Sequence, residues 1–235
     1  MTTDTAQDFN GRLVIVTGGT GALGEAVVNL LLARGAQCRV PVHGTLDPAR
    51  QPVRERVTYV ERCDLSDEDD VARLFDGAAG AWASIHVAGG FEMAPAEDID
   101  RPALTRMLDM NFVSCHLCCR GALRAFGETG GRIVNVSARP ALEPRAGAGM
   151  TAYVASKAAV AALTQALAAE VAGRGVLVNA VAPSTIDTPA NRLAMPKANH
   201  ALWPTPAEIA ETIAFLASPG NRVTSGAIVP VYGKA

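Results

Sequence analysis

The feature of this sequence that most restricts its fold is a repeated succession of elements. A short apolar, β-branched run is followed by a turn and then by a longer segment with apolar residues at helical spacing. The first example is Leu13-Val-Ile-Val16, which ends in Thr17-Gly18-Gly19 and precedes a helical pattern over residues 22–33. Unbroken apolar strands of this kind are typical of parallel sheets buried on both faces. The pattern therefore predicts an α/β fold with helices on both faces of a sheet.

The same succession continues to the end of the chain. The expected strands are 13–16, 38–42, 57–60, 82–87, 132–136, 176–181 and 228–231, and the expected helices are 22–33, 66–76, 101–126, 151–172 and 206–216. Seven parallel strands with helices between them describe a doubly wound Rossmann fold, which binds nucleotides. Pro41 lacks the N–H that a strand donates, so we expect strand 38–42 to end early or to kink.

Length and charge restrict the organisation and the partners. A chain of 235 residues has the size of one domain, so we expect residues 1–235 to form one domain with a short substrate lid around residues 188–206. The formal net charge of −2 gives no positive field for a nucleic acid or an anionic surface. No apolar stretch reaches the roughly 20 residues of a membrane span. We expect neither nucleic acid nor a membrane as a partner.

The first ten residues lack the basic and apolar regions of a secretory signal, so we expect the protein in the cytoplasm. Five cysteines at scattered spacings do not predict a disulfide framework. Cys115, Cys118 and Cys119 cluster around His116, but no second group follows at zinc-finger spacing. We therefore expect buried thiols and no metal.

A glycine-rich turn, Thr17 to Gly24, follows the first strand and opens the first helix. Glycines at such a place allow a tight turn and let backbone amides approach a pyrophosphate, with the positive helix end facing the anion. The turn therefore predicts dinucleotide binding. The residues expected to contact the cofactor are Gly18, Thr20, Gly21, Leu23 and Gly24.

Tyr153 and Lys157 are four residues apart in a segment of strong helix formers, which places both on one helix face. An ammonium about 5 Å from the phenolic oxygen would favour the phenolate by roughly 3 kcal/mol, or about two pK units. The pair is therefore expected to exchange a proton near physiological pH.

This pair and several other motifs together resemble the short-chain dehydrogenase/reductase family, in its compact single-domain branch, over roughly Gly11 to Gly233. The matching pieces, in the family's order, are Thr17 to Gly24, Asp64-Leu65, Ala88-Gly89, Asn111, Ser137, Tyr153 with Lys157, and Pro183 to Thr188. The resemblance implies that Tyr153 is the general acid or base and that Lys157 lowers its pKa and holds the nicotinamide ribose. Ser137 would hydrogen-bond the reacting oxygen. Asn111 would hold a helix turn open and anchor a water that leads to Lys157.

The resemblance also implies the rest of the cofactor site, at the carboxyl ends of the strands. Ile186 and Thr188, in the segment that starts at Pro183, would hold the carboxamide. Asp64 and Leu65 would lie beside the adenine, and Ala88 and Gly89 would lie under the ribose.

The sequence departs from the family pattern at several positions. Ala22 stands where the compact branch usually has a glycine, and Gly21 and Gly24 fit the spacing of the extended branch. His86-Val87 replaces the two asparagines before Ala88, and Ser184 replaces a glycine. Ser137 precedes Tyr153 by 16 positions, more than is usual, so we expect the loop 138–150 to bulge over the pocket and to displace Ser137.

The choice between NADP and NAD depends on the end of the second strand. An acidic residue there binds a ribose 2′-hydroxyl, and an arginine attracts a 2′-phosphate. Pro41 to Gly44 contains neither. The absence of a carboxylate favours NADP slightly, with His43 or Arg39 reaching the phosphate, whereas a purely structural His43 fits the sequence equally well.

The resemblance implies an NAD(P)-dependent oxidoreductase that interconverts a small ketone and a secondary alcohol. The alternatives are a non-catalytic dinucleotide sensor or scaffold and an epimerase or dehydratase of the same family. The family implies a homodimer or homotetramer through the helices 101–126 and 151–172, with a monomer as the alternative. The residues expected around a mainly apolar pocket are Phe91, Met93, Leu142, Met150, His200 and Trp203.

Overall fold

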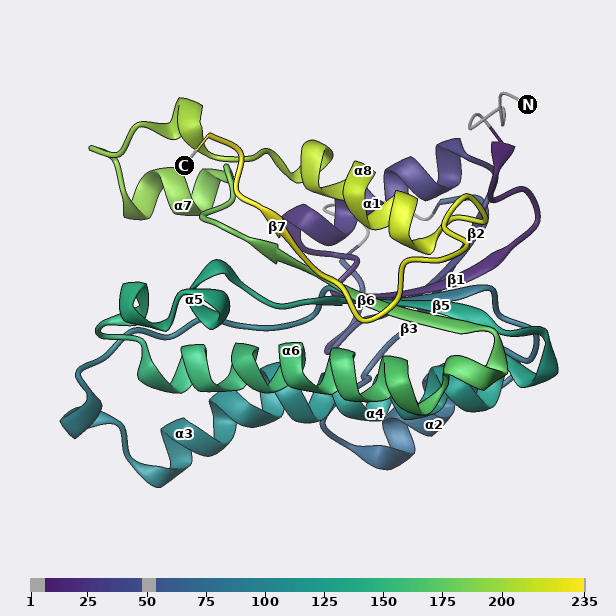
Figure 1. The fold of residues 1–235 in the computed structure, drawn as a ribbon, viewed down its shortest axis with the longest axis horizontal. Helices are drawn as coiled ribbons and strands as arrows, with labels where there is room; N and C mark the ends of the chain where they lie inside the picture. The colour runs from purple at the N-terminus through teal and green to yellow at the C-terminus, as the bar shows by residue number, and fades with distance from the viewer. Residues whose placement is uncertain (1–6, 48–53, 235) are drawn as a thin grey trace.

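A seven-stranded parallel sheet forms the centre of the computed structural model, which describes residues 7–47 and 54–234 (Figure 1). The strand order is β3-β2-β1-β4-β5-β6-β7, and each neighbouring pair is parallel. The strands are β1 (Leu13–Thr17), β2 (Gln37–Pro41), β3 (Val57–Val60), β4 (Ala83–His86), β5 (Gly131–Val136), β6 (Val176–Pro183) and β7 (Ile228–Val231). The sequence order reverses between β1 and β4, as in a doubly wound Rossmann fold, so the expected fold class is confirmed.

Helices cover both faces of the sheet. They are α1 (Ala22–Ala33), α2 (Glu68–Phe75), α3 (Arg101–Leu108), α4 (Ser114–Ala125), α5 (Arg139–Leu142), α6 (Thr151–Glu170), α7 (Pro189–Ala194) and α8 (Pro206–Ala217). Figure 1 shows α1 and α8 on one side of the sheet and α2, α4 and α6 on the other. Short 3₁₀ turns lie at Ala96–Asp98, Gly127–Thr129, Pro144–Gly147, Ala172–Arg174 and His200–Leu202.

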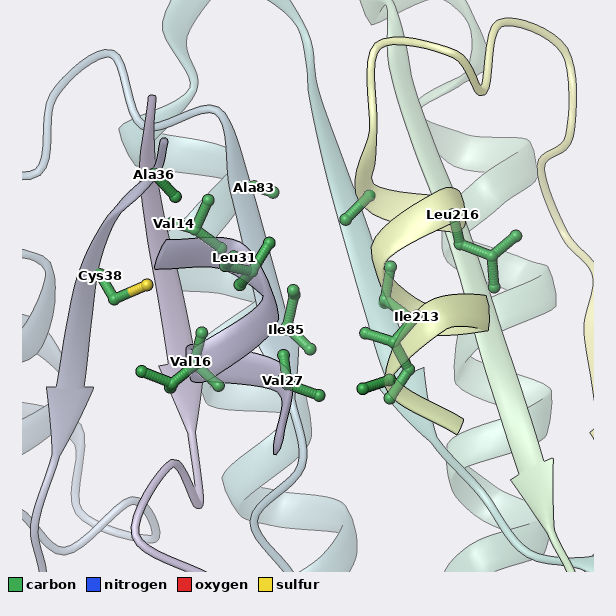
Figure 2. Close-up of a cluster of buried hydrophobic side chains, with 14 of the residues drawn as sticks. Val14, Val16, Val27, Leu31, Ala36, Cys38, Ala83, Ile85, Ile213 and Leu216 are labelled. Atoms are coloured by element: carbon green, nitrogen blue, oxygen red, sulfur yellow. The ribbon is translucent and has the colours of Figure 1, made fainter. Parts of the chain in front are cut away.

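The apolar strands form two separate cores because successive side chains of a strand point to opposite faces. Val14 and Val16 of β1 belong to the core on the α1 and α8 side, which also contains Leu31 of α1 and Ile213 of α8 (Figure 2). Ile15, between them in the sequence, belongs to the core on the α2, α4 and α6 side. Both cores contain fully buried side chains, so the sheet holds a fixed position between its two helix layers.

Three differences from the sequence expectations bear on the site. The predicted helix 101–126 is interrupted by a π-helical turn, η3 (Asp109–Val113). The predicted loop after β5 contains the short helix α5, and the predicted lid around residues 188–206 contains α7, each with a proline in its first turn. Strand β2 ends at Pro41, as expected from the missing N–H of that residue.

Helix α6 is long and apolar enough to cross a membrane by length and composition alone, with a mean hydropathy of 1.2. It packs against the sheet, and Ser156, Lys157 and Thr164 on it are buried. Burial against the sheet accounts for its apolar face. Of the ten residues from which we expect the compartment, the first six lie outside the described part of the chain.

Candidate active site

The turn between β1 and α1 brings two backbone segments so close that side chains are excluded. A Cβ on Gly18 would lie 2.7 Å from the Ala88 nitrogen, and Gly18 has a φ of +66°. A Cβ on Gly24 would lie 2.0 Å from the Gly18 carbonyl oxygen. The Ala88 amide also donates to Thr17 Oγ1 at 3.2 Å. The turn, the start of α1 and the end of β4 therefore meet at one point, where only glycine fits.

A cavity of about 580 Å³ opens beside this turn at the carboxyl edge of the sheet. Of the cofactor residues expected from the sequence, those that line it are Gly18, Thr20, His43, Asp64, Leu65, Ala88 and Gly89. In a doubly wound sheet this is the crevice in which a ligand binds. These residues therefore share one wall of the cavity, and their contact with a cofactor stays a prediction.

Asp64 and His43 share this wall. Ser66 donates to Asp64 Oδ1 from its hydroxyl at 2.7 Å and from its amide at 2.9 Å. These bonds from Ser66 lower the pKa of Asp64, and the charge of His43 adds a smaller effect. The Asp64 carboxylate is therefore held in place and ionised, ready to accept hydrogen bonds from a ligand.

Tyr153 and Lys157 lie on the first two turns of α6, one helical turn apart. The Tyr153 ring meets Phe91 edge to face, with the ring centroids 5.0 Å apart. The Lys157 side chain is 5% exposed, and its Nζ donates to the Val136 carbonyl at the end of β5 at 3.0 Å. A Cβ on Gly89 would lie 3.0 Å from that Nζ. Gly89, which lines the cavity, therefore lies next to the Lys157 ammonium.

The structure corrects the expected direction of the Tyr153 pKa. Burial raises this pKa to about 12, instead of Lys157 lowering it. Burial also lowers the pKa of Lys157 to about 8. Burial is the cause of the first shift and the larger cause of the second, while Nζ donates to the Val136 carbonyl. Tyr153 is therefore a protonated phenol at neutral pH, which is the form that donates a proton.

Ser137 follows β5 and is 2% exposed. Its hydroxyl donates to the backbone carbonyl of Lys157 at 2.8 Å. A hydroxyl has one proton to donate, so in this arrangement it cannot also donate to a substrate oxygen. The end of β5 therefore holds Lys157 twice, at Nζ through Val136 and at the backbone through Ser137. The predicted contact between Ser137 and the reacting oxygen requires this hydroxyl to turn.

Asn111 lies in the π-helical turn and is buried. Its Nδ2 donates to the Gly90 and Met107 carbonyls at 3.1 and 3.2 Å, and its Oδ1 accepts from the Gly90 amide at 3.1 Å. The side chain thus replaces helix bonds and fixes the strand extension after β4. The widened turn lies where the sequence analysis expected Asn111 to hold the helix open.

The remaining predicted residues lie around the carboxyl ends of β1 and β6. Pro183 ends β6 and pairs with Val231. Thr188 caps α7, because its Oγ1 accepts from the Asn191 amide at 3.2 Å, and the Ile186 carbonyl accepts from Asn191 Nδ2 at 2.8 Å. The side chain of Leu23 is buried in the core, so only the backbone of this residue can face a ligand. Gly21 precedes α1 as its N-cap.

The opposite wall of the cavity was not predicted from the sequence. This wall includes Arg106, Asp109, Met110 and Ser114, which come from the region where α3, the π-helical turn and α4 follow one another. No motif marks these residues. They reach the cavity because the widened turn at Asn111 shifts the helix face, which a regular helical period cannot predict.

Comparison with known proteins gives a family and a fold. A sequence model described as short chain dehydrogenase matches residues 12–199. Cis-4-hydroxycyclohexanecarboxylate dehydrogenase of Sinomonas cyclohexanicum is 37% identical over 243 residues, covering 96% of each chain. A solved short chain dehydrogenase/reductase family protein superposes with a TM-score of 0.86 at 29% identity, covering 97% of this chain and 98% of the other. ElxO with NADP bound has a TM-score of 0.86 at 21% identity, over 95% of this chain and 98% of that one, which shows likeness of fold.

Proposed function

Because the chain belongs to the short-chain dehydrogenase family and is similar to proteins named as dehydrogenases, we propose that it interconverts a ketone and a secondary alcohol with NAD(P). The observation that carries the proposal is the connection from the cavity through Gly89 to Lys157 and, one helical turn away, to Tyr153. A sensor has no chemical need for a buried lysine beside a phenol at this edge of the sheet.

The residues of the cavity fit a dinucleotide. At Gly18 and Gly24 the backbone comes so close to its neighbours that no Cβ has room. The N-terminal end of α1 follows this turn beside the cavity, where a helix end favours a pyrophosphate. The bound cofactor would supply or accept the hydride. Asp64, Leu65, Ala88 and Gly89 would hold its adenosine half, and the segment Pro183 to Thr188 its nicotinamide half.

The chain's own groups then handle the proton. Tyr153 donates its proton to the carbonyl oxygen during reduction and removes it from the alcohol during oxidation. Lys157 holds a ribose hydroxyl and, once its charge faces a developing phenolate, stabilises it. Asn111 fixes Gly90 and so the Gly89 backbone beside Lys157. Ser137 positions Lys157, as its hydrogen bond to the Lys157 carbonyl supports.

We further propose NADP over NAD and a compact, mainly apolar substrate. Among the described residues at the end of β2, the two that line the cavity are Pro41 and His43, so no carboxylate of this strand end repels a 2′-phosphate. Phe91 and Met93 are 60% and 63% exposed, and Phe91 stands against the Tyr153 ring. The named substrate of the relative from Sinomonas cyclohexanicum is a secondary alcohol on a carbon ring.

The decisive experiment replaces the proposed acid. We expect Tyr153→Phe to lower turnover of ketones by at least about 100-fold, because a positioned acid or base contributes that much or more. Binding of reduced cofactor, followed by fluorescence, should be unchanged. Tyr59→Phe on β3 is the matched control, with wild-type turnover expected. Turnover of a ketone panel by Tyr153→Phe at the wild-type rate would overturn the proposed mechanism, and cofactor binding without turnover by the wild type would favour the sensor.

A further inference from the structure

A buried cluster of polar side chains on the other side of Lys157 has no part in the proposed reaction. It contains His86 at the end of β4, Asn135 on β5, and Cys115 and Cys119 on α4. Each of the four is at most 5% exposed. The fold assembles them by simple rules: His86 and Asn135 are register partners on neighbouring strands, and the two cysteines are four residues apart on one helix face.

The donor atoms of these side chains converge on one point. His86 Nδ1 lies 2.8 Å from Asn135 Oδ1, and the sulfurs of Cys115 and Cys119 lie 3.3 and 3.7 Å from that oxygen. The same sulfurs lie 4.0 and 3.6 Å from His86 Nδ1. The nitrogen and both sulfurs are all within 4.8 Å of one another. In a tetrahedral zinc site with ordinary bond lengths, ligand atoms are about 3.3–3.8 Å apart, so the Nδ1–Oδ1 pair would open from its hydrogen-bond distance of 2.8 Å and the Cys115 sulfur would move closer to Nδ1.

More hydrogen-bond donors of the cluster are directed at Asn135 Oδ1 than this oxygen can accept. Asn135 donates to Thr164 Oγ1 through Nδ2 at 2.9 Å, which fixes its Oδ1 toward His86 and the sulfurs. Nδ1–H and two S–H groups then all point at this one oxygen, which has two lone pairs. A cation that replaces thiol protons would relieve this excess.

We propose that His86 Nδ1, Asn135 Oδ1 and the thiolates of Cys115 and Cys119 form a structural site for a zinc ion. Two thiolates neutralise the charge of the dication, so the complete site adds no net charge to the core. Binding releases both thiol protons, and the Nδ1 proton moves to Nε2. There it meets the Ser84 hydroxyl, 2.8 Å away, which orients the ring from behind. All four positions are filled by protein atoms, which is typical of structural and not catalytic zinc.

Metal analysis of untagged protein tests this site. We expect one zinc ion per chain after expression in zinc-supplemented medium. Cys119→Ser should lower the content at least tenfold, whereas Cys118→Ser should retain it, because Cys118 is equally buried and adjacent but lies outside the cluster. Wild-type protein refolded with Co²⁺ should show thiolate-to-cobalt charge transfer and tetrahedral d–d bands, which decides the question even if Cys119→Ser does not fold.

Each outcome bears on the proposal. Zinc content unaffected by Cys119→Ser would overturn it, as would equal losses in both variants. Wild-type protein that takes up neither zinc during expression nor Co²⁺ during refolding would also overturn the proposal. The four side chains would then be held by their hydrogen bonds alone. None of these measurements depends on dehydrogenase activity, so the proposed function and this site can fail separately.

Discussion

Lys157 shows at the scale of one residue how burial and function compete. Its ammonium is enclosed between β5 and α6 and keeps one hydrogen bond, to the Val136 carbonyl. Desolvation of a charge costs more than one such bond returns, which is why the pKa falls to about 8. The position of Tyr153 and Lys157 on one face of a helix could be predicted from their spacing in the sequence. The direction of their pKa shifts could not, because burial depends on the strands and loops that pack around the helix.

The buried charge of Lys157 gives a prediction for stability against pH. The unfolded chain binds a proton between pH 8 and 10.5 that the folded chain does not, so this group makes the free energy of unfolding rise across that window. Lys157→Met removes the effect. We expect the stability of this variant relative to wild type to be greatest below pH 8 and to fall by about 3 kcal/mol by pH 10.5.

Urea unfolding at a series of pH values measures this difference. Lys197→Met, at an exposed lysine, is the control. A stability difference between Lys157→Met and wild type that stays constant from pH 7 to pH 10.5 would show that Lys157 keeps its ordinary protonation in the fold.

Ser137 gives a second prediction at this scale. If its hydroxyl positions Lys157 through the backbone, Ser137→Ala should lower kcat/KM by about fivefold, the effect of one ordinary hydrogen bond. The alkaline limb of the pH–rate profile should also move, because the environment of Lys157 changes. A loss of 100-fold or more with an unmoved profile would instead place the hydroxyl on the reacting oxygen.

At the scale of elements, the junction of β1 and α1 shows what a motif can predict. The position of the glycine-rich turn within a strand–turn–helix unit was sufficient to predict a tight turn and close packing. In the structure Gly24 touches the Gly18 carbonyl, whereas Gly21 has ordinary space around it. The family resemblance placed an opened helix turn at Asn111, where the π-helical turn lies, but the bonds of Asn111 to the distant Gly90 could not be predicted from the helical pattern of residues 101–126.

The two glycines provide a matched pair of variants. Gly24→Ala would place a Cβ 2.0 Å from a backbone oxygen, so we expect it to cost about 3 kcal/mol of stability or more and to abolish cofactor binding. Gly21→Ala meets nothing closer than 3.5 Å, and Gly21 has a φ of −90° that alanine adopts freely. Its thermal midpoint should stay within a few degrees of wild type. Equal unfolding midpoints for both variants would contradict the packing role of Gly24.

At the scale of the whole molecule, the site is assembled from segments far apart in the sequence. Parallel strands place their carboxyl ends at one edge, so the ends of β1, β4, β5 and β6 meet there although they span much of the chain. This topology made one wall of the cavity predictable from the strand ends, whereas the wall formed by the region of α3, the π-helical turn and α4 was not predicted. The cluster of His86 with Cys115 and Cys119 could not be predicted, because His116 stands nearer in the sequence and only the packing of α4 on β4 and β5 brings the cysteines to His86.

The last prediction concerns the association of several copies of this chain into an oligomer. Helix α6 leaves a row of small side chains exposed, Ala155, Ala162, Ala166 and Ala169, on the face away from the sheet. Small residues allow two helices to approach closely, so we expect a dimer or tetramer that uses this face. Ala162→Arg should convert it to a smaller species in sedimentation velocity, whereas Ala72→Arg on α2 should not. Because no residue of the proposed chemistry faces this surface, the smaller species should keep its cofactor affinity, and a wild-type chain that sediments as a monomer would refute the expected assembly.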